Sequence, residues 1–268
     1  MKNLGKLAIL GAVLASSASF AFGSGISLGS YGQAGLSSYD PITGTGLANT
    51  AMQFVGSETY STFSSVPSQS TVSTLASLSG FSTAGAGEAY ELNPGTVPTG
   101  GWTAAPSGSA YVGSTAASGP IGTSNPSYGY YEYTTTINGL TSNYLGSLTV
   151  LADDTTEVFL TTSAGTTTLV PFGSLGSDNQ CSDNVPDCIT PDTVSLALLS
   201  GNNTLTFVVE QAGNSPMGGP GLTGNPSGVA FDASLNVNVI PEPDSLMLLG
   251  TGLLGVGGML MHRRRVTA

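Results

Sequence analysis

Hydrophobic and polar residues alternate along the second half of the chain with the period of two that is typical of β-strands. The alternation is most regular at residues 147–151 and 231–239, where Leu, Val, Ala or Phe alternates with Ser, Thr, Asp or Asn. One face of each such strand is expected to be buried and the other solvated. This pattern, together with β-branched and aromatic content, predicts strands at residues 128–137, 147–152, 156–161, 166–170, 194–199, 204–210 and 229–239.

The first half of the chain has weaker strand signals. Residues 24–51 are rich in Gly, Ser and Thr, which predicts a poorly ordered lead-in. Residues 52–63 contain the first strand or pair of strands, and short strands are expected at 88–92 and 109–112. No long amphipathic helix competes with these strands. The sequence therefore predicts an all-β ectodomain over residues 52–239, built as an antiparallel two-sheet sandwich or jelly roll.

The N-terminus has the composition of a secretory signal peptide. Lys2 and Lys6 precede an apolar stretch at residues 7–14, and a small-residue stretch runs from there to Gly23. Because the apolar stretch is short and small residues follow it directly, a cleaved signal is favoured over an uncleaved anchor. We expect residues 1–23 to direct export.

The C-terminal residues 240–268 combine three signals in order. They are a proline-flanked tripeptide, an apolar segment expected to cross the membrane and a basic cluster: Pro241-Glu242-Pro243, residues 245–262, and Arg263, Arg264 and Arg265. An apolar helix of this length can span a thin bilayer, and arginines stay on the cytoplasmic side. The residues before the tail are therefore expected to face the periplasm while the protein is anchored.

This tail resembles the PEP-CTERM sorting tail of Gram-negative bacteria. The resemblance implies recognition at the inner membrane by an exosortase-type enzyme and removal of the tail. It also implies transfer of the protein to the cell surface or to an extracellular polysaccharide matrix. An ordinary single-span anchor that is never processed is the alternative.

Several ectodomain segments resemble galactose-binding-like jelly-roll domains found on PEP-CTERM proteins. They are Trp102 and residues 109–112, 129–136, 152–160, 199–207 and 226–229. The resemblance covers about residues 52–239 and implies a jelly-roll fold. In such domains the segment that contains the Asp-Asp pair, here residues 152–160, is typically followed by an Asn-Gly turn. This chain has Thr and Ser at residues 161–163 instead. The resemblance therefore extends to the fold more firmly than to a ligand site at this turn.

Residues 24–240 carry no positive charge. All five Lys and Arg residues and the single His lie in the chain ends. Of the 16 acidic residues only Glu242 and Asp244 lie in the tail, which leaves 14 in residues 24–240. Nucleic acid binding is excluded because no cation is available to neutralise phosphates. Serine-triad, Schiff-base and zinc-hydrolase chemistry lack their necessary groups. No carboxylate pair stands out for glycoside hydrolysis, so the protein is expected not to be an enzyme.

Acidic residues near two strand ends and in one loop are the candidate Ca²⁺ ligands. They are Asp153, Asp154, Asp178, Asp183 and Asp187. Hard cations take carboxylate oxygens, but the spacing lacks a calcium-loop order. The favoured interpretation of Asp153 and Asp154 is that they cap turn amides. The favoured interpretation of the other three residues is a solvated acidic loop.

Two further sets of residues are candidates for structural or binding roles. Cys181 and Cys188 are the only cysteines, and a local disulfide is expected because the compartment outside the membrane is oxidising. Exposed aromatic rings can stack on sugar faces, which makes four rings candidate sugar-binding residues. These rings are Trp102, Tyr111, Tyr131 and Tyr133. Burial of these rings in the core is the favoured alternative, with Tyr130 on the opposite face from Tyr131 and Tyr133.

These observations predict an exported, non-enzymatic protein of the cell surface or of an exopolysaccharide-associated matrix. The expected partners are the exosortase-type enzyme, the inner membrane before processing and exopolysaccharide. A Ca²⁺-assisted carbohydrate-binding module is the alternative, and a glycoside hydrolase is a remote one. Apart from Ca²⁺ in that alternative, no cofactor is expected.

Overall fold

The computed structural model places most of the ectodomain and a short part of the tail. It describes residues 25–30, 48–49, 51–62, 65–66, 80–92, 102, 104–120, 126–153, 155–171, 191–211, 226–238 and 251–255. Ser24–Val237 forms one compact unit.

The larger sheet contains seven strands among the described residues, and we call it the seven-stranded sheet. Its strands are β1 (Ile26–Gly29), β2 (Ala48–Asn49), β4 (Ala89–Leu92), β5 (Tyr111–Gly113), β7 (Tyr144–Asp153), β10 (Asp192–Leu198) and β12 (Gly228–Val237). Their order is β10-β7-β12-β5-β4-β2, and β1 pairs with β12. All the pairings are antiparallel.

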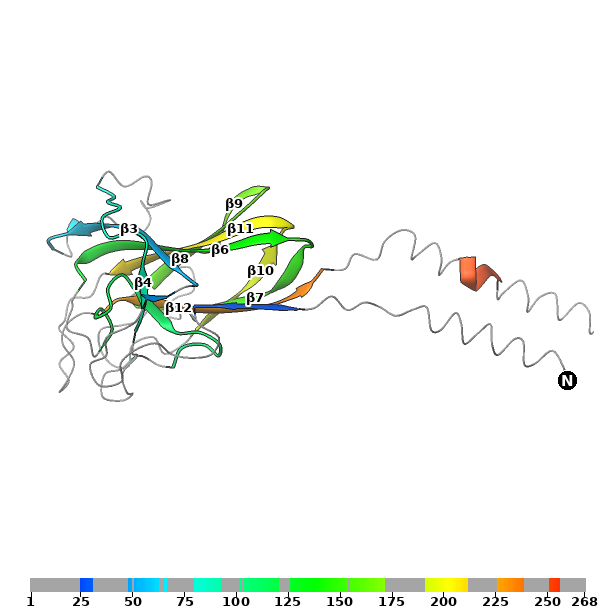
Figure 1. Cartoon of the computed structure of the whole chain (residues 1–268), viewed down its shortest axis with the longest axis horizontal. Coiled ribbons are helices and arrows are strands. Elements are labelled where there is room, and N and C mark those ends of the chain that lie inside the picture. Colours follow the sequence, from blue (N-terminus) through cyan, green and yellow to red (C-terminus); the bar gives the residue numbers. More distant parts are fainter. Residues whose placement is uncertain are drawn as a thin grey trace, which may run out of the picture. The chain divides into compact units, whose positions relative to one another are not determined.

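The other layer is a five-stranded sheet. Its strands are β3 (Gln53–Tyr60), β6 (Tyr128–Leu140), β8 (Thr155–Thr162), β9 (Gly165–Val170) and β11 (Gly201–Gln211), and they lie in the order β3-β6-β11-β8-β9. They too pair antiparallel. Figure 1 shows the two sheets as separate layers. The predicted all-β fold of two antiparallel sheets is confirmed.

The alternating segments of the second half form strands where the sequence predicts them. Each of the seven predicted segments corresponds to one strand of the structure, from β6 to β12, with ends that differ by a few residues. The lead-in at residues 24–51 differs from its prediction, because β1 and β2 come from it. Ile26 and Leu28 of β1 pack against the core. This strand is too short for its alternation to stand out among the surrounding Gly and Ser residues.

Ser30 attaches the end of β1 to two other segments. Its side chain is fully buried, its Oγ donates to the carbonyl of Ala110 at 2.5 Å, and the same Oγ accepts from the backbone N–H of Phe231 at 3.1 Å. The Ser30 N–H in turn donates to the Phe231 carbonyl at 3.0 Å. A small hydroxyl side chain therefore satisfies backbone groups that would otherwise be buried without partners.

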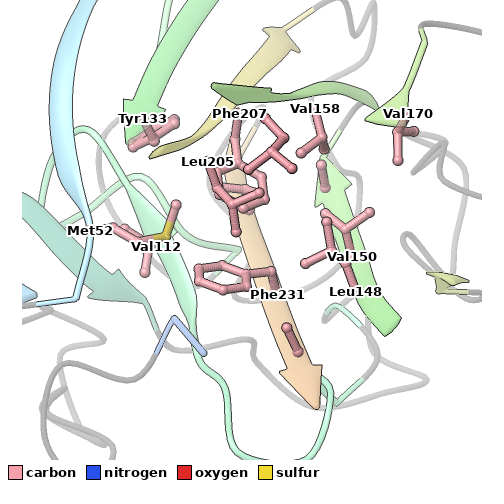
Figure 2. Packing of buried hydrophobic residues seen from close by; sticks show 14 of the residues in the cluster. Met52, Val112, Tyr133, Leu148, Val150, Val158, Val170, Leu205, Phe207 and Phe231 are labelled. Atoms are coloured by element: carbon pink, nitrogen blue, oxygen red, sulfur yellow. The ribbon is translucent and has the colours of Figure 1, made fainter. Parts of the chain in front are cut away.

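The main core fills the space between the two sheets. Leu148, Val150 and Phe231 of the seven-stranded sheet face Val158, Leu205 and Phe207 of the five-stranded sheet, and all six are fully buried (Figure 2). The rings of Phe207 and Phe231 stack with centroids 4.8 Å apart. A stacked aromatic pair of this kind contributes about 0.5–1.5 kcal/mol beyond the burial of its area. Hydrophobic burial therefore holds the two layers together.

The Phe207–Phe231 contact yields a stability prediction. Phe231→Ala should lower the free energy of unfolding by about 3–5 kcal/mol, because it removes a buried ring and leaves a cavity between the sheets. Leu145→Ala is the matched control, since Leu145 lies on β7 but is 47% exposed. Denaturant unfolding of both variants measures the difference. Equal losses in the two variants would contradict the assigned core.

Candidate functional site

Trp102 and Tyr111, two of the predicted sugar-binding residues, are buried on the outer side of the seven-stranded sheet. Both are 1% exposed, and they form a small cluster with Leu92, Leu151 and Ala230 that is separate from the main core. Their ring centroids are 4.5 Å apart. The cluster depends on a glycine at residue 228, because a Cβ there would approach the Trp102 ring to 2.9 Å.

Tyr131 and Tyr133, the other two predicted sugar-binding residues, lie in the main core. Both rings pack against Phe54, with centroids 6.3 Å and 5.5 Å from its ring. Tyr130 belongs to a different cluster on the outer side of the five-stranded sheet, as the alternation predicts. The prediction of a sugar-stacking platform made by Trp102, Tyr111, Tyr131 and Tyr133 is therefore wrong, because none of these rings has an exposed face. The alternative that they are core residues is confirmed.

Asp153 is the one predicted Ca²⁺ ligand that lies within the described residues. It is 1% exposed at the end of β7, and its Oδ2 accepts a hydrogen bond from the Trp102 indole N–H at 2.6 Å. Burial, and after it the negative charge of Asp153, raises the pKa of Tyr111. Asp153 therefore connects the end of β7 to the aromatic cluster. The sequence carries no signal for this contact, since 51 residues separate the partners.

The other predicted site residues of the ectodomain lie outside the described residues. They are Asp154, Asp178, Asp183, Asp187, Cys181 and Cys188. The disulfide and the acidic-loop interpretation therefore stay predictions. Within the part of the chain that the structure describes, no three Asp, Glu, His or Cys side chains come together to hold a metal ion.

Four glutamates that the sequence analysis did not single out share the outer face of the five-stranded sheet. Tyr130 on β6 pairs with Glu58 of β3 on one side and with Glu210 of β11 on the other. Two residues along, Glu132 pairs with Val208, which pairs with Glu157 of β8. We call Glu58, Glu132, Glu157 and Glu210 the carboxylate patch. Only cross-strand register brings these residues together, so spacing along the chain could not reveal them.

Most of the acidic side chains of the carboxylate patch are buried from solvent. Glu58, Glu157 and Glu210 are buried, and a small apolar cluster of Tyr130, Phe159 and Val208 lies on the same face. The half-buried Val66 and Phe81 pack against this cluster. Ionised carboxyls are costly in such surroundings unless they are paired or hydrogen-bonded.

Two carboxyls of the patch, Glu157 and Glu132, favour the protonated form. Burial raises the pKa of Glu157 to about 7 and also raises the pKa of Glu132. Glu58 is stabilised differently, because the Tyr60 hydroxyl donates to its Oε1 at 2.6 Å. Burial, this hydrogen bond and the charge of Glu58 raise the pKa of Tyr60 to about 12. Glu157 therefore binds a proton in a pH range where an exposed carboxyl is ionised.

The tail contains the part of the chain that matches a known family. The model of the PEP-CTERM protein-sorting motif matches residues 239–265. Residues 239–265 are a PEP-CTERM sorting motif. The match includes Pro241, Glu242 and Pro243 and the cluster Arg263, Arg264 and Arg265, so the expected sorting signal is confirmed.

Only a short part of the PEP-CTERM motif is structurally described. Residues 251–255 form an α-helix in which Leu253 and Leu254 are exposed. Among the described residues, no helix has the length and apolar character needed to cross a membrane. Most of the expected transmembrane segment at 245–262, and all of residues 1–23, lie outside the described residues. The membrane span and the signal peptide therefore stay predictions.

The chain has weak structural likeness to several carbohydrate-binding modules. A CBM4 structure shares 13% identity and covers 50% of this chain and 73% of its own, with a TM-score of 0.24. Xyl-CBM35 in complex with a disaccharide containing glucuronic acid shares 16% identity over 52% of this chain and 82% of its own, with a TM-score of 0.24. A family 35 module from Clostridium thermocellum shares 16% identity over 54% and 88%, with a TM-score of 0.23. No curated protein sequence matches the chain.

The raised pKa of Glu157 predicts that the protein is more stable in acid. A carboxyl whose pKa rises from 4.5 to about 7 on folding stabilises the fold below pH 4.5, and that contribution is lost as the pH rises to about 7. Glu157→Gln should remove roughly 2 kcal/mol of this pH dependence, after allowance for solvent screening. Glu88→Gln, which removes an exposed carboxyl outside the patch, is the matched control. Unfolding free energies measured across this range test both variants, and identical profiles for wild type and Glu157→Gln would refute the assignment.

The hydrogen bond between Trp102 and Asp153 predicts a coupling between the two residues. Trp102→Phe, Asp153→Ala and the double variant should give a coupling energy of about 1–3 kcal/mol, because each single variant leaves a buried polar group without this partner. Tyr90 and Glu88 provide the control, since their hydrogen bond of 2.8 Å is exposed. The cycle Tyr90→Phe with Glu88→Ala should give less than about 1 kcal/mol. If the coupling energy of Trp102 and Asp153 is no larger than that of Tyr90 and Glu88, the buried hydrogen bond does not stabilise the fold more than the exposed one.

Proposed function

We propose that this protein is a non-enzymatic component of the cell surface or of an exopolysaccharide-associated matrix, delivered there by exosortase-dependent sorting. The observation that carries the proposal is the PEP-CTERM motif at residues 239–265. Its basic end would hold the C-terminus at the cytoplasmic side of the inner membrane while the ectodomain faces the periplasm. Removal of the tail would then release the ectodomain.

The composition of the ectodomain supports a structural role. Residues 24–240 have no Lys, Arg or His, so most nucleophile, acid–base and metal-dependent mechanisms lack a necessary group. The glycoside hydrolase alternative needs an accessible pair of carboxyls on either side of a sugar. Glu58, Glu157 and Glu210 share one face, but all three side chains are buried. We therefore favour a role that requires no catalysis.

Replacement of the arginine cluster tests the sorting step. Arg263→Asp, Arg264→Asp and Arg265→Asp together should leave the protein unprocessed or misdirected, because the segment loses the positive charges that keep its end in the cytoplasm. Cell fractionation and the intact mass of the mature protein are the measurements. Thr267→Asp is the control, since it adds a negative charge beyond the matched residues and keeps all three arginines. The sorting proposal fails if the triple variant shows the wild-type mature mass and the wild-type distribution.

A further inference from the structure

Threonine side chains form two rows on the outer face of the five-stranded sheet. The first row runs through paired positions on β6, β11, β8 and β9. The second row lies two residues farther along each of these strands and also includes a position on β3. Their members are Thr136, Thr204, Thr161 and Thr166 in the first row, and Gln53, Thr134, Thr206, Phe159 and Thr168 in the second. We call these positions the threonine rows. The strands that carry them lie side by side in Figure 1.

The threonine rows face away from the core and are open to solvent over much of their length. Their positions alternate with core residues such as Tyr133, Leu160 and Leu205, so they belong to the outer face. Thr136, Thr161, Thr166 and Thr168 are exposed, while Thr134, Thr204 and Thr206 are half-buried. The exposed amides of Asn138 and Asn202 extend the surface beyond the first row.

The two rows carry no ionisable side chain, although residues 24–240 have 14 carboxylates and no positive charge. The equivalent threonine pair of the other sheet has a different neighbour. Thr149 and Thr193 pair on β7 and β10, but Thr149 also pairs with the carboxylate Asp232. The threonine rows therefore form an uncharged surface on a strongly anionic unit, which repels polyanions and favours a neutral partner.

Strand geometry arranges the hydroxyls in a regular pattern. Neighbouring strands lie about 4.8 Å apart and side chains on one face repeat every ~6.8 Å along a strand. Each threonine hydroxyl both donates and accepts hydrogen bonds, as each sugar hydroxyl does. Its methyl group adds an apolar contact for the carbon face of a sugar ring. Such single contacts are weak, but a polymer that engages many of them at once binds by multivalency.

We propose that the threonine rows are a docking surface for a neutral polysaccharide chain. This inference rests on the proposed surface or matrix function and specifies which partner the ectodomain holds there. It places the contact on strands of the sandwich rather than on the buried aromatic rings. Binding would depend on hydroxyl contacts and not on charge, so salt would affect it little.

Binding of the full-length protein to insoluble polysaccharides tests the proposal. The protein, purified in a mild detergent, should bind cellulose or cross-linked dextran but not cross-linked polygalacturonate, and added NaCl should not displace it from the neutral polymer. The double variant Thr161→Val and Thr166→Val should weaken that binding ~10-fold, since it removes two exposed hydroxyls and keeps β-branched side chains.

The double variant Thr149→Val and Thr193→Val is the matched control. It breaks a hydroxyl pair of 3.1 Å on the seven-stranded sheet, as the test variant breaks one of 2.9 Å on the five-stranded sheet. It should bind as wild type does, and melting temperatures of both variants check the fold. If the test variant unfolds, the single variant Thr136→Val probes the same row.

Three results would overturn the docking surface: no binding of wild type to either neutral polymer, equal binding to polygalacturonate, or equal loss in the test and control variants. The mature mass and the cell fraction of the Thr161→Val and Thr166→Val variant test the sorting proposal independently of binding. These should match wild type. Lost binding with normal sorting leaves the proposed delivery intact, whereas wild-type protein that never reaches the surface contradicts the proposed function itself.

Discussion

The ectodomain has to stabilise its carboxylates without any positively charged side chain, and this constraint governs much of its structure. Aromatic donors take the place that Lys and Arg have in other proteins. The Trp102 indole N–H donates to Asp153, the Tyr60 hydroxyl to Glu58, and the Tyr90 hydroxyl to Glu88. A hydrogen bond from a neutral donor stabilises a carboxylate less than an ion pair in good geometry does, but it also avoids the desolvation of a second charge.

Glu157 is accommodated by a raised pKa instead. Glu157 lies beside the apolar cluster of Tyr130, Phe159 and Val208, and burial moves its pKa to about 7. The charge of the ectodomain therefore falls in mild acid more readily than the number of acidic residues suggests. This property would reduce repulsion between neighbouring copies of the protein on an acidified surface.

Polar groups are distributed differently over the two outer faces of the sandwich. On the seven-stranded sheet, Trp102 and Tyr111 cover one part of the face, and Asp232 pairs with the half-buried Thr149, which in turn pairs with the exposed Thr193. On the five-stranded sheet, the carboxylate patch with its apolar cluster adjoins the uncharged threonine rows, and Phe159 belongs to both the cluster and the second row. A single sheet therefore carries a carboxylate region and a neutral hydroxyl region side by side.

The sequence by itself determined the strands from residue 128 onward, the all-β class and the sorting tail, because these depend on local alternation and on short motifs in a fixed order. Only the tertiary structure decided the role of the aromatic residues. Trp102, Tyr111, Tyr131 and Tyr133 have side chains suited both to a sugar platform and to a core, and burial against residues distant in sequence selected the core. The same holds for Ser30 with Phe231, for Trp102 with Asp153, and for Glu58 with Glu210 on either side of Tyr130. Cross-strand register brings together residues that the sequence places far apart, and register is set by the packing of whole sheets rather than by any local pattern.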